Sequence, residues 1–166
     1  MIPMQTGSLD THTLRNLPWG ADVRAVLAAA LDAVDPQPAV LRALHADERI
    51  AAAVKASRRV LAVGAGKAAY PMALALEQFL GDQLAGGLVV TKDGHVPAKN
   101  ELHRMRAVEA GHPLPDGRGL DAARQIAALL QTTGPDDLVF CLISGGGSAL
   151  LTAPVEGIAL ADLQQL

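Results

Sequence analysis

Aromatic residues and cysteine are scarce in this sequence, and both shortages narrow the class of protein. Phe, Trp and Tyr make up 2% of the 166 residues, too few for the stacking platform that single-stranded nucleic acids need. The formal net charge of −3 also has the wrong sign for a protein that neutralises a phosphate backbone. A lone Cys141 cannot form an intramolecular disulfide or a cysteine-rich metal site. The sequence therefore argues against a nucleic-acid partner, and no metal ligands are assigned from it.

Long apolar runs are missing as well. No stretch reaches the roughly 18 uninterrupted apolar residues of a membrane span, and Met1–Asp10 lacks the basic region and apolar run of a secretory signal. We therefore expect a cytoplasmic protein without a membrane partner. Half of the residues are nevertheless hydrophobic, which is enough for a buried core, and the length suits one domain.

The order of the apolar segments predicts an α/β fold. Residues 1–18 are expected to be irregular, and residues 19–166 to form one α/β domain with a helical N-terminal lead-in. Apolar residues recur at helical steps over Trp19–Val34, and a second helix is expected over 39–55. From Val60 onward, strands alternate with helices, which favours a parallel sheet covered on both faces. The expected architecture is a Rossmann-like, three-layer domain with a mostly parallel sheet.

Short apolar segments mark the expected strands, which are Val60–Val63, Leu88–Thr91, Arg104–Ala110 and Leu138–Ile143. The last is a run of six apolar residues, a pattern typical of a strand covered on both faces. Cys141 lies within this run and is expected to be an inert core residue. Asp116 is a good candidate for the N-cap of the following helix.

Two glycine-rich loops that follow strands are the main functional signal. In a parallel sheet, loops at the carboxyl ends of the strands line the ligand crevice. Glycine lets the backbone approach a phosphate closely, and the start of the next helix offers amide donors. Lys67 adds a mobile cation to the first loop, and serine hydroxyls flank the second. The candidate anion-binding residues of the two loops are Gly64, Gly66 and Lys67, and Ser144, Gly145, Gly146, Gly147 and Ser148.

Three further polar side chains are expected near these loops. Lys92 and His95 follow the second strand, so they should face the same rim as Lys67. His112 lies between Gly111 and Pro113 in a loop of constrained shape. All three are candidate substrate ligands, while a solvated loop for Lys92 and His95, and a backbone-bonded structural role for His112, remain as alternatives.

Known phosphate motifs fit the first loop only in part. A P-loop needs glycine where Leu61 stands and Ser or Thr where Ala68 stands, so a P-loop NTPase is excluded. The dinucleotide fingerprint Gly-x-Gly-x-x-Gly/Ala does fit residues 64–69, with Asp93 near the place of its acidic ribose ligand. That fingerprint leaves the second glycine loop unexplained, so a dinucleotide enzyme stays open as an alternative.

A resemblance to one family rests on four ordered segments, which are Gly64–Ala68, Thr91–His95, Glu109–Asp116 and Ser144–Leu151. From about Trp19 to its end, the chain resembles the amino-terminal part of the bacterial-type glycerate 2-kinases, which have also been labelled hydroxypyruvate reductases. Asp93 departs from the pattern, because an aromatic residue is more usual there.

The resemblance implies phosphorylation of D-glycerate at its 2-hydroxyl by ATP with Mg²⁺, in a cleft between two α/β domains. By that likeness, Lys67 is the catalytic candidate that steadies the transferring phosphate, and Ser144–Ser148 cradles nucleotide phosphates or the substrate carboxylate. Family members are more than twice as long, so we expect a chain truncated at its C-terminus. Such a chain would lack the domain that completes the cleft and would be inactive alone. An NAD(P)H-dependent hydroxypyruvate reductase and a non-catalytic sugar-phosphate-binding regulator remain the alternatives.

Overall fold

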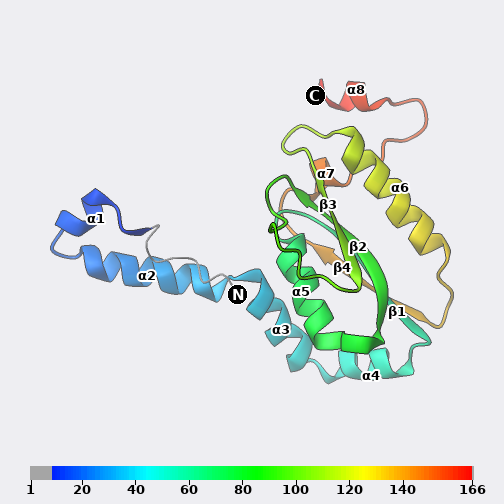
Figure 1. The fold of residues 1–166 in the computed structure, drawn as a ribbon, viewed down its shortest axis with the longest axis horizontal. Coiled ribbons are helices and arrows are strands. Elements are labelled where there is room, and N and C mark those ends of the chain that lie inside the picture. The colour runs from blue at the N-terminus through cyan, green and yellow to red at the C-terminus, as the bar shows by residue number, and fades with distance from the viewer. Residues whose placement is uncertain (1–8, 166) are drawn as a thin grey trace.

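The computed structural model describes residues 9–165. Residues 1–8 of the segment expected to be irregular, and Leu166, lie outside the described residues. It is an α/β structure (Figure 1). Its helices and strands, in chain order, are α1 (His12–Asn16), α2 (Gly20–Ala33), α3 (Pro36–Ala46), α4 (Glu48–Ala56), β1 (Arg59–Ala65), α5 (Ala69–Leu80), the 3₁₀ turn η2 (Gly81–Gln83), β2 (Leu84–Lys92), β3 (Met105–Ala110), α6 (Gly117–Gln131), β4 (Asp137–Ile143), α7 (Gly147–Leu150) and α8 (Leu160–Leu163).

The N-terminal helices differ from the expectation in two places. Part of the region expected to be irregular is the short helix α1, because the Thr11 side chain accepts a hydrogen bond from the amide of Leu14 and caps it. The single helix expected over 39–55 is two helices, since Asp47 ends α3 and its carboxylate caps α4 through the amide of Arg49. Helix α2 extends away from the sheet (Figure 1) and buries only Gly20. None of the helices between residues 9 and 165 combines the length and apolar character needed to span a membrane.

The four strands form one sheet in the order β3-β2-β1-β4, and every neighbouring pair is parallel. This confirms the predicted α/β class. Each strand therefore ends at the same edge of the sheet, and the connection that follows it starts there. β1 is central, pairing with β2 from Val60 and with β4 from Arg59. Its inner position explains why it is buried almost throughout.

Helices cover the two faces of the sheet and enclose two apolar clusters. Helix α5 lies on one side and α6 on the other (Figure 1). On the α5 side, Leu76 and Leu84 are fully buried with side chains from α3 and α4. On the α6 side, Leu150 of the short α7 packs against Val90 and Ile126. The sequence expectation of a sheet between two helical layers is thus confirmed.

Strand β4 is the exception to that coverage, and the expectation that it is buried on both faces is wrong. Leu142 packs into the α5-side cluster, but Ile143 is 64% exposed and Cys141 is exposed. The reason is topological: β4 is an edge strand, and α6 packs over β2 and β3 instead. Cys141 is therefore a surface thiol of this chain and not a core residue.

Asp137 links the start of the edge strand β4 to the start of β1. Its carboxylate, which has no exposed surface, accepts hydrogen bonds from Arg58, Arg59 and the amide of Gly134. The hydrogen bond from Arg59, followed by that from Gly134, holds the pKa of Asp137 below its ordinary value. Because the folded pKa is the lower one, the stabilisation is complete above the unfolded value of 3.8 and is lost as the pH falls through the folded value.

We therefore expect Asp137→Asn to lower the melting temperature by several degrees at neutral pH and to flatten the loss of stability in acid. Thermal unfolding at about pH 7 and about pH 3.5, near the carboxylate's unfolded pKa, measures both effects. Asp47→Asn is the control, since that carboxylate pairs only with Arg49 of its own helix. Equal acid sensitivity of the wild-type chain and Asp137→Asn would contradict the prediction.

Candidate functional site

Both glycine loops lie at the carboxyl edge of the sheet, side by side. Loop one (Gly64–Lys67) ends β1 and leads to α5, and loop two (Ser144–Ser148) ends β4 and leads to α7. They are neighbours because β1 and β4 pair in parallel up to Ala65 and Ile143. The connections after β2 and β3 reach the same edge and carry Lys92, His95 and His112. The fold thus brings the four segments that carry the family resemblance to the same carboxyl edge of the sheet, called the rim below.

Hydrogen bonds join the two loops directly. The amide of Lys67 donates to the carbonyl of Gly145 at 2.9 Å, and the amide of Ala68 donates to the Ser144 hydroxyl at 3.0 Å. In return, the amide of Ser144 donates to the carbonyl of Ala65 at 3.0 Å. The loops are therefore one connected structure, and part of the polar capacity of each is committed to the other.

This arrangement gives the glycines of loop one a packing role. Gly66 has φ +130°, and a Cβ there would overlap the Ser144 hydroxyl and lie 2.6 Å from its carbonyl oxygen. The amides of Lys67, Ala68 and Ala69 all donate to protein acceptors. Loop one thus offers a ligand its lysine side chain more than its backbone, and ligand contact by Gly64 and Gly66 stays a prediction.

We expect Gly66→Ala to destabilise the fold by about 3 kcal/mol, because it combines left-handed backbone strain with crowding against loop two. Urea unfolding measures the change. Gly81→Ala is the matched control: its φ is also positive, at +50°, yet none of the described residues places an atom within 4 Å of the added methyl group. That control should lose only the cost of its backbone conformation, about 1–2 kcal/mol. Equal losses in the two variants would show that the contact with Ser144 does not matter.

Lys67, His112 and Gly146 meet at the centre of the rim. A Cβ placed on Gly146 would lie 2.9 Å from Nε2 of His112 and 3.3 Å from Cε of Lys67. Both side chains therefore lie against the bare backbone of loop two. Lys67 is exposed, and none of the ion pairs among residues 9–165 uses its ammonium group. A cation, an imidazole and a glycine backbone thus face the same space.

Loop two keeps backbone donors available. Gly146 has φ +86°, a left-handed conformation that suits glycine and turns successive amides toward one side. Among the residues that the structure describes, no backbone or side-chain acceptor pairs with the amides of Gly145 and Gly146. Such amides, beside a lysine, suit an oxyanion of a phosphate or carboxylate. Ser148 is exposed, while the Ser144 hydroxyl already accepts the amide of Ala68.

Lys92 ends β2, and His95, which follows this strand, contacts loop one. Nδ1 of His95 lies 2.9 Å from the carbonyl oxygen of Lys67, so the ring donates there when Nδ1 carries the proton. The amide of His95 donates to the carbonyl of Lys92, whose side chain is half-buried. The structure thus gives His95 a definite role in holding Lys67, while direct ligand contact by His95 and Lys92 stays a prediction.

An ion cluster that the sequence did not point to connects the remaining loops. The guanidinium of Arg118 binds both oxygens of Asp93, at 2.6 and 2.8 Å, and Oδ2 of Asp116 at 2.6 Å. Asp116 caps α6, as predicted, through the amides of Arg118 and Gly119, and it also accepts the amide of Gly111. The one related signal in the sequence is Asp93, which stands where the resembled family more often has an aromatic residue.

The charges of this cluster are fixed by its contacts. The hydrogen bond from Arg118 holds the pKa of Asp93 below its usual range. Burial raises the pKa of Asp116, but the hydrogen bonds from Arg118, Gly119 and Gly111 outweigh burial and leave it lowered. Both carboxylates raise the pKa of Arg118 in turn. The three groups are therefore ionised together at neutral pH.

Residues 9–165 do not by themselves form a complete protein site for Mg²⁺. Within residues 9–165 there is no group of three or more His, Cys, Asp or Glu side chains that could hold a metal ion. Asp93 and Asp116 are engaged with Arg118, and Glu109 accepts the amide of Val96. Since Mg²⁺ prefers free carboxylate oxygens, no step through the metal is assigned to this part of the chain.

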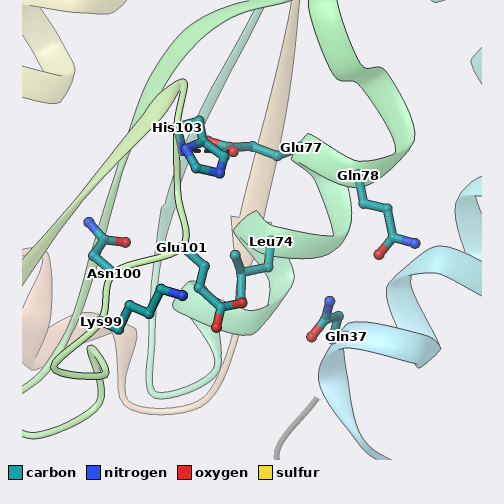
Figure 2. A pocket seen from close by; sticks show the side chains of 8 residues that line it. All are labelled: Gln37, Leu74, Glu77, Gln78, Lys99, Asn100, Glu101 and His103. Carbon is teal, nitrogen blue, oxygen red and sulfur yellow. Dashed lines mark hydrogen bonds between the residues drawn. The ribbon is translucent and has the colours of Figure 1, made fainter.

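A polar cavity of about 430 Å³ lies elsewhere, between α3, α5 and the segment that precedes β3 (Figure 2). Its carboxylate Glu77 accepts hydrogen bonds from the amides of His103, Arg104 and Met105, so it serves to hold the entry into β3. Lys99 and Glu101 reach into this cavity from the opposite wall (Figure 2). None of the predicted site residues lines it, and the candidate site stays at the carboxyl edge.

An α/β protein with an all-parallel sheet, and with paired glycine loops at its carboxyl edge, is the class that fold and site define. The chain belongs to the family described as "Domain of unknown function (DUF4147)", whose profile matches residues 22–166.

Named relatives place this family among enzymes. "Glycerate 2-kinase" from Pyrococcus horikoshii is 39% identical over 151 residues, covering 86% of this chain and 33% of the relative. "Putative hydroxypyruvate reductase" from Agrobacterium vitis is 46% identical over 104 residues, covering 63% and 26%. The crystal structure of glycerate kinase from Thermotoga maritima superposes with a TM-score of 0.69 at 33% identity, covering 85% and 32%. The chain thus spans about a third or less of the length of these relatives.

Proposed function

We propose that this chain is the amino-terminal α/β part of a glycerate 2-kinase, which transfers a phosphoryl group from ATP to the 2-hydroxyl of D-glycerate. The observation that carries the proposal is the meeting of Lys67, His112 and the bare backbone of Gly146 at the carboxyl edge. Relatives named as glycerate kinases, aligned over most of the chain, support the substrate and the reaction class.

To catalyse phosphoryl transfer, the site must neutralise the negative charge of the phosphate groups and hold the two substrates in position. Phosphoryl transfer spreads negative charge over the oxygens of the moving group, and fixed donors around it lower the barrier. Lys67 supplies a full positive charge that can follow those oxygens, and the amides of Gly145 and Gly146 supply fixed donors. Lys92, His95, His112 and Ser148 are the proposed further ligands of phosphate or substrate carboxylate. Mg²⁺, as the usual companion of ATP, would neutralise phosphate charge when bound.

We further propose that residues 19–166 act with a C-terminal domain of a longer polypeptide, which supplies the other wall of the cleft. The chain covers only about a third of the length of the relatives, which supports this. We also propose a cytoplasmic location, in keeping with the proposed small-molecule substrate. Since one wall alone cannot exclude water or position two substrates, the 166-residue chain should bind ATP weakly and show little turnover.

The test is a coupled assay of the longer enzyme with ATP, Mg²⁺ and D-glycerate, with the product analysed by ³¹P NMR. The expected product is 2-phosphoglycerate, and the isolated 166-residue chain should give little or none. Absence of any phosphoglycerate from the longer enzyme would refute the kinase. Robust turnover by the isolated chain would refute the need for a second domain.

A dinucleotide-dependent reductase is the second candidate, because residues 64–69 follow β1 and precede α5 as the dinucleotide fingerprint requires. Two contacts count against it. The carboxylate of Asp93, expected to bind ribose hydroxyls, is held on both oxygens by Arg118. The amides that would cradle the pyrophosphate donate to protein acceptors instead. Hydroxypyruvate-dependent oxidation of NADH would reverse this ranking, and tight sugar-phosphate binding without turnover would favour a regulator.

A further inference from the structure

The cluster of Arg118, Asp93 and Asp116 lies between the two connections that carry the site histidines. Asp93 is two residues before His95, in the connection that leaves β2. Asp116 holds the amide of Gly111, the residue before His112, in the connection that leaves β3. Arg118 on α6 grips both carboxylates at once, so it ties these connections to each other and to the helix.

The guanidinium is not arranged as a ligand for phosphate. Four of its contacts reach carboxylate oxygens, two on Asp93 and two on Asp116, at 2.6 to 2.8 Å. Its planar fork is therefore occupied by bidentate pairing, and the cluster as a whole carries a net negative charge. An anion would gain nothing by approaching it. Arg118 therefore contributes to the site by holding the two connections in place, and its charge is neutralised by its carboxylate partners.

The two histidines in these connections contact different groups around Lys67. His95 contacts the carbonyl of Lys67, whereas His112 and the lysine side chain both lie against Gly146. A shift of either connection would move one imidazole relative to the lysine. Arginine is suited to this bridge because a lysine ammonium lacks the planar fork that grips two carboxylates together.

We propose that Arg118 is a positioning residue of the anion site: by pairing with Asp93 and Asp116, it sets His95 and His112 at their places around Lys67. The inference rests on the proposed function for the nature of the ligand, but its structural part concerns the ligand-free chain. It predicts that both histidines respond together when Arg118 is removed.

The experiment compares Arg118→Ala, Arg118→Lys and the control Arg124→Ala in the 166-residue chain. Arg124 lies on the same helix and pairs only with Asp121 three residues earlier. Carbon–proton NMR spectra of the histidine rings without ligand are the first measurement, and ATP affinity is the second. Arg118→Ala should shift the ring signals of both His95 and His112 and weaken ATP binding about tenfold. Arg118→Lys should recover only part of this, and Arg124→Ala should change neither.

Each outcome has a defined meaning. If Arg118→Ala leaves either ring signal in place, or if Arg124→Ala moves both, the positioning role is refuted. If the wild-type chain binds no ATP, the nucleotide part of the proposed function fails, while the histidine signals still decide about Arg118. Should Arg118→Ala not fold, Asp93→Asn keeps the shape of the side chain and removes one link. It should shift the His95 signal and weaken ATP binding with an unchanged melting temperature, and failure to do so refutes the proposal.

Discussion

Lys67→Ala is expected to lower the turnover of the longer kinase by about 10²- to 10³-fold while the melting temperature stays unchanged, because the lysine is the movable cation of the site. Its side chain is exposed and takes part in no ion pair among residues 9–165, so the fold does not depend on it. Steady-state kinetics with ATP and D-glycerate, together with thermal unfolding, measure the two effects.

The controls separate charge from shape. Lys55→Ala removes an exposed lysine near the end of α4, away from the carboxyl edge, and should leave turnover unchanged. Lys67→Arg keeps the charge and should retain more activity than the alanine variant. Near-normal turnover of Lys67→Ala would exclude the lysine from the mechanism, whatever the other loops do.

Gly146→Ala should be the next most damaging substitution for ligand binding. The added methyl group would lie 2.9 Å from Nε2 of His112 and 3.3 Å from Cε of Lys67, so both side chains must move. Displacing two ligand groups by a fraction of an ångström should weaken ATP binding and lower turnover by about tenfold to a hundredfold. Isothermal titration with ATP and the kinase assay measure the change.

Gly157→Ala provides the matched comparison. Gly157 has φ +89°, close to the φ of +86° at Gly146, but none of the described residues places an atom within 4 Å of the added methyl group. Both variants should therefore lose about 1 kcal/mol of stability from backbone strain, and only Gly146→Ala should lose affinity. Equal ATP affinities in the two variants would contradict the proposed contact of loop two with the ligand.

The sequence predicted the parts of the fold that local pattern controls. Apolar segments with glycine after them located the strands. The capping role of Asp116 also followed from residue type, since its carboxylate holds the amides at the start of α6. These features depend on neighbours a few residues apart, which is the range that a single sequence makes visible.

Features that depend on strand order were not predictable. Cys141 was expected in the core because its segment is apolar, but burial of a strand is decided by its neighbours in the sheet, and β4 lies at the edge. The bridging role of Arg118 was likewise hidden, because its partner Asp93 is 25 residues away. The sequence predicts that the glycines of loop one let a ligand approach the backbone. In the structure, the close neighbour of Gly66 is instead Ser144 of loop two.

The bonds that join loop one to loop two have a consequence for affinity. A phosphate site made of separate flexible loops must order them at the moment of binding, and that lost entropy is subtracted from the binding free energy. Here Lys67 and Ala68 are already fastened to Gly145 and Ser144 by folding itself. In the proposed anion site, the entropy of ordering these two loops is therefore lost once, when the chain folds, and is not lost again when an anion binds.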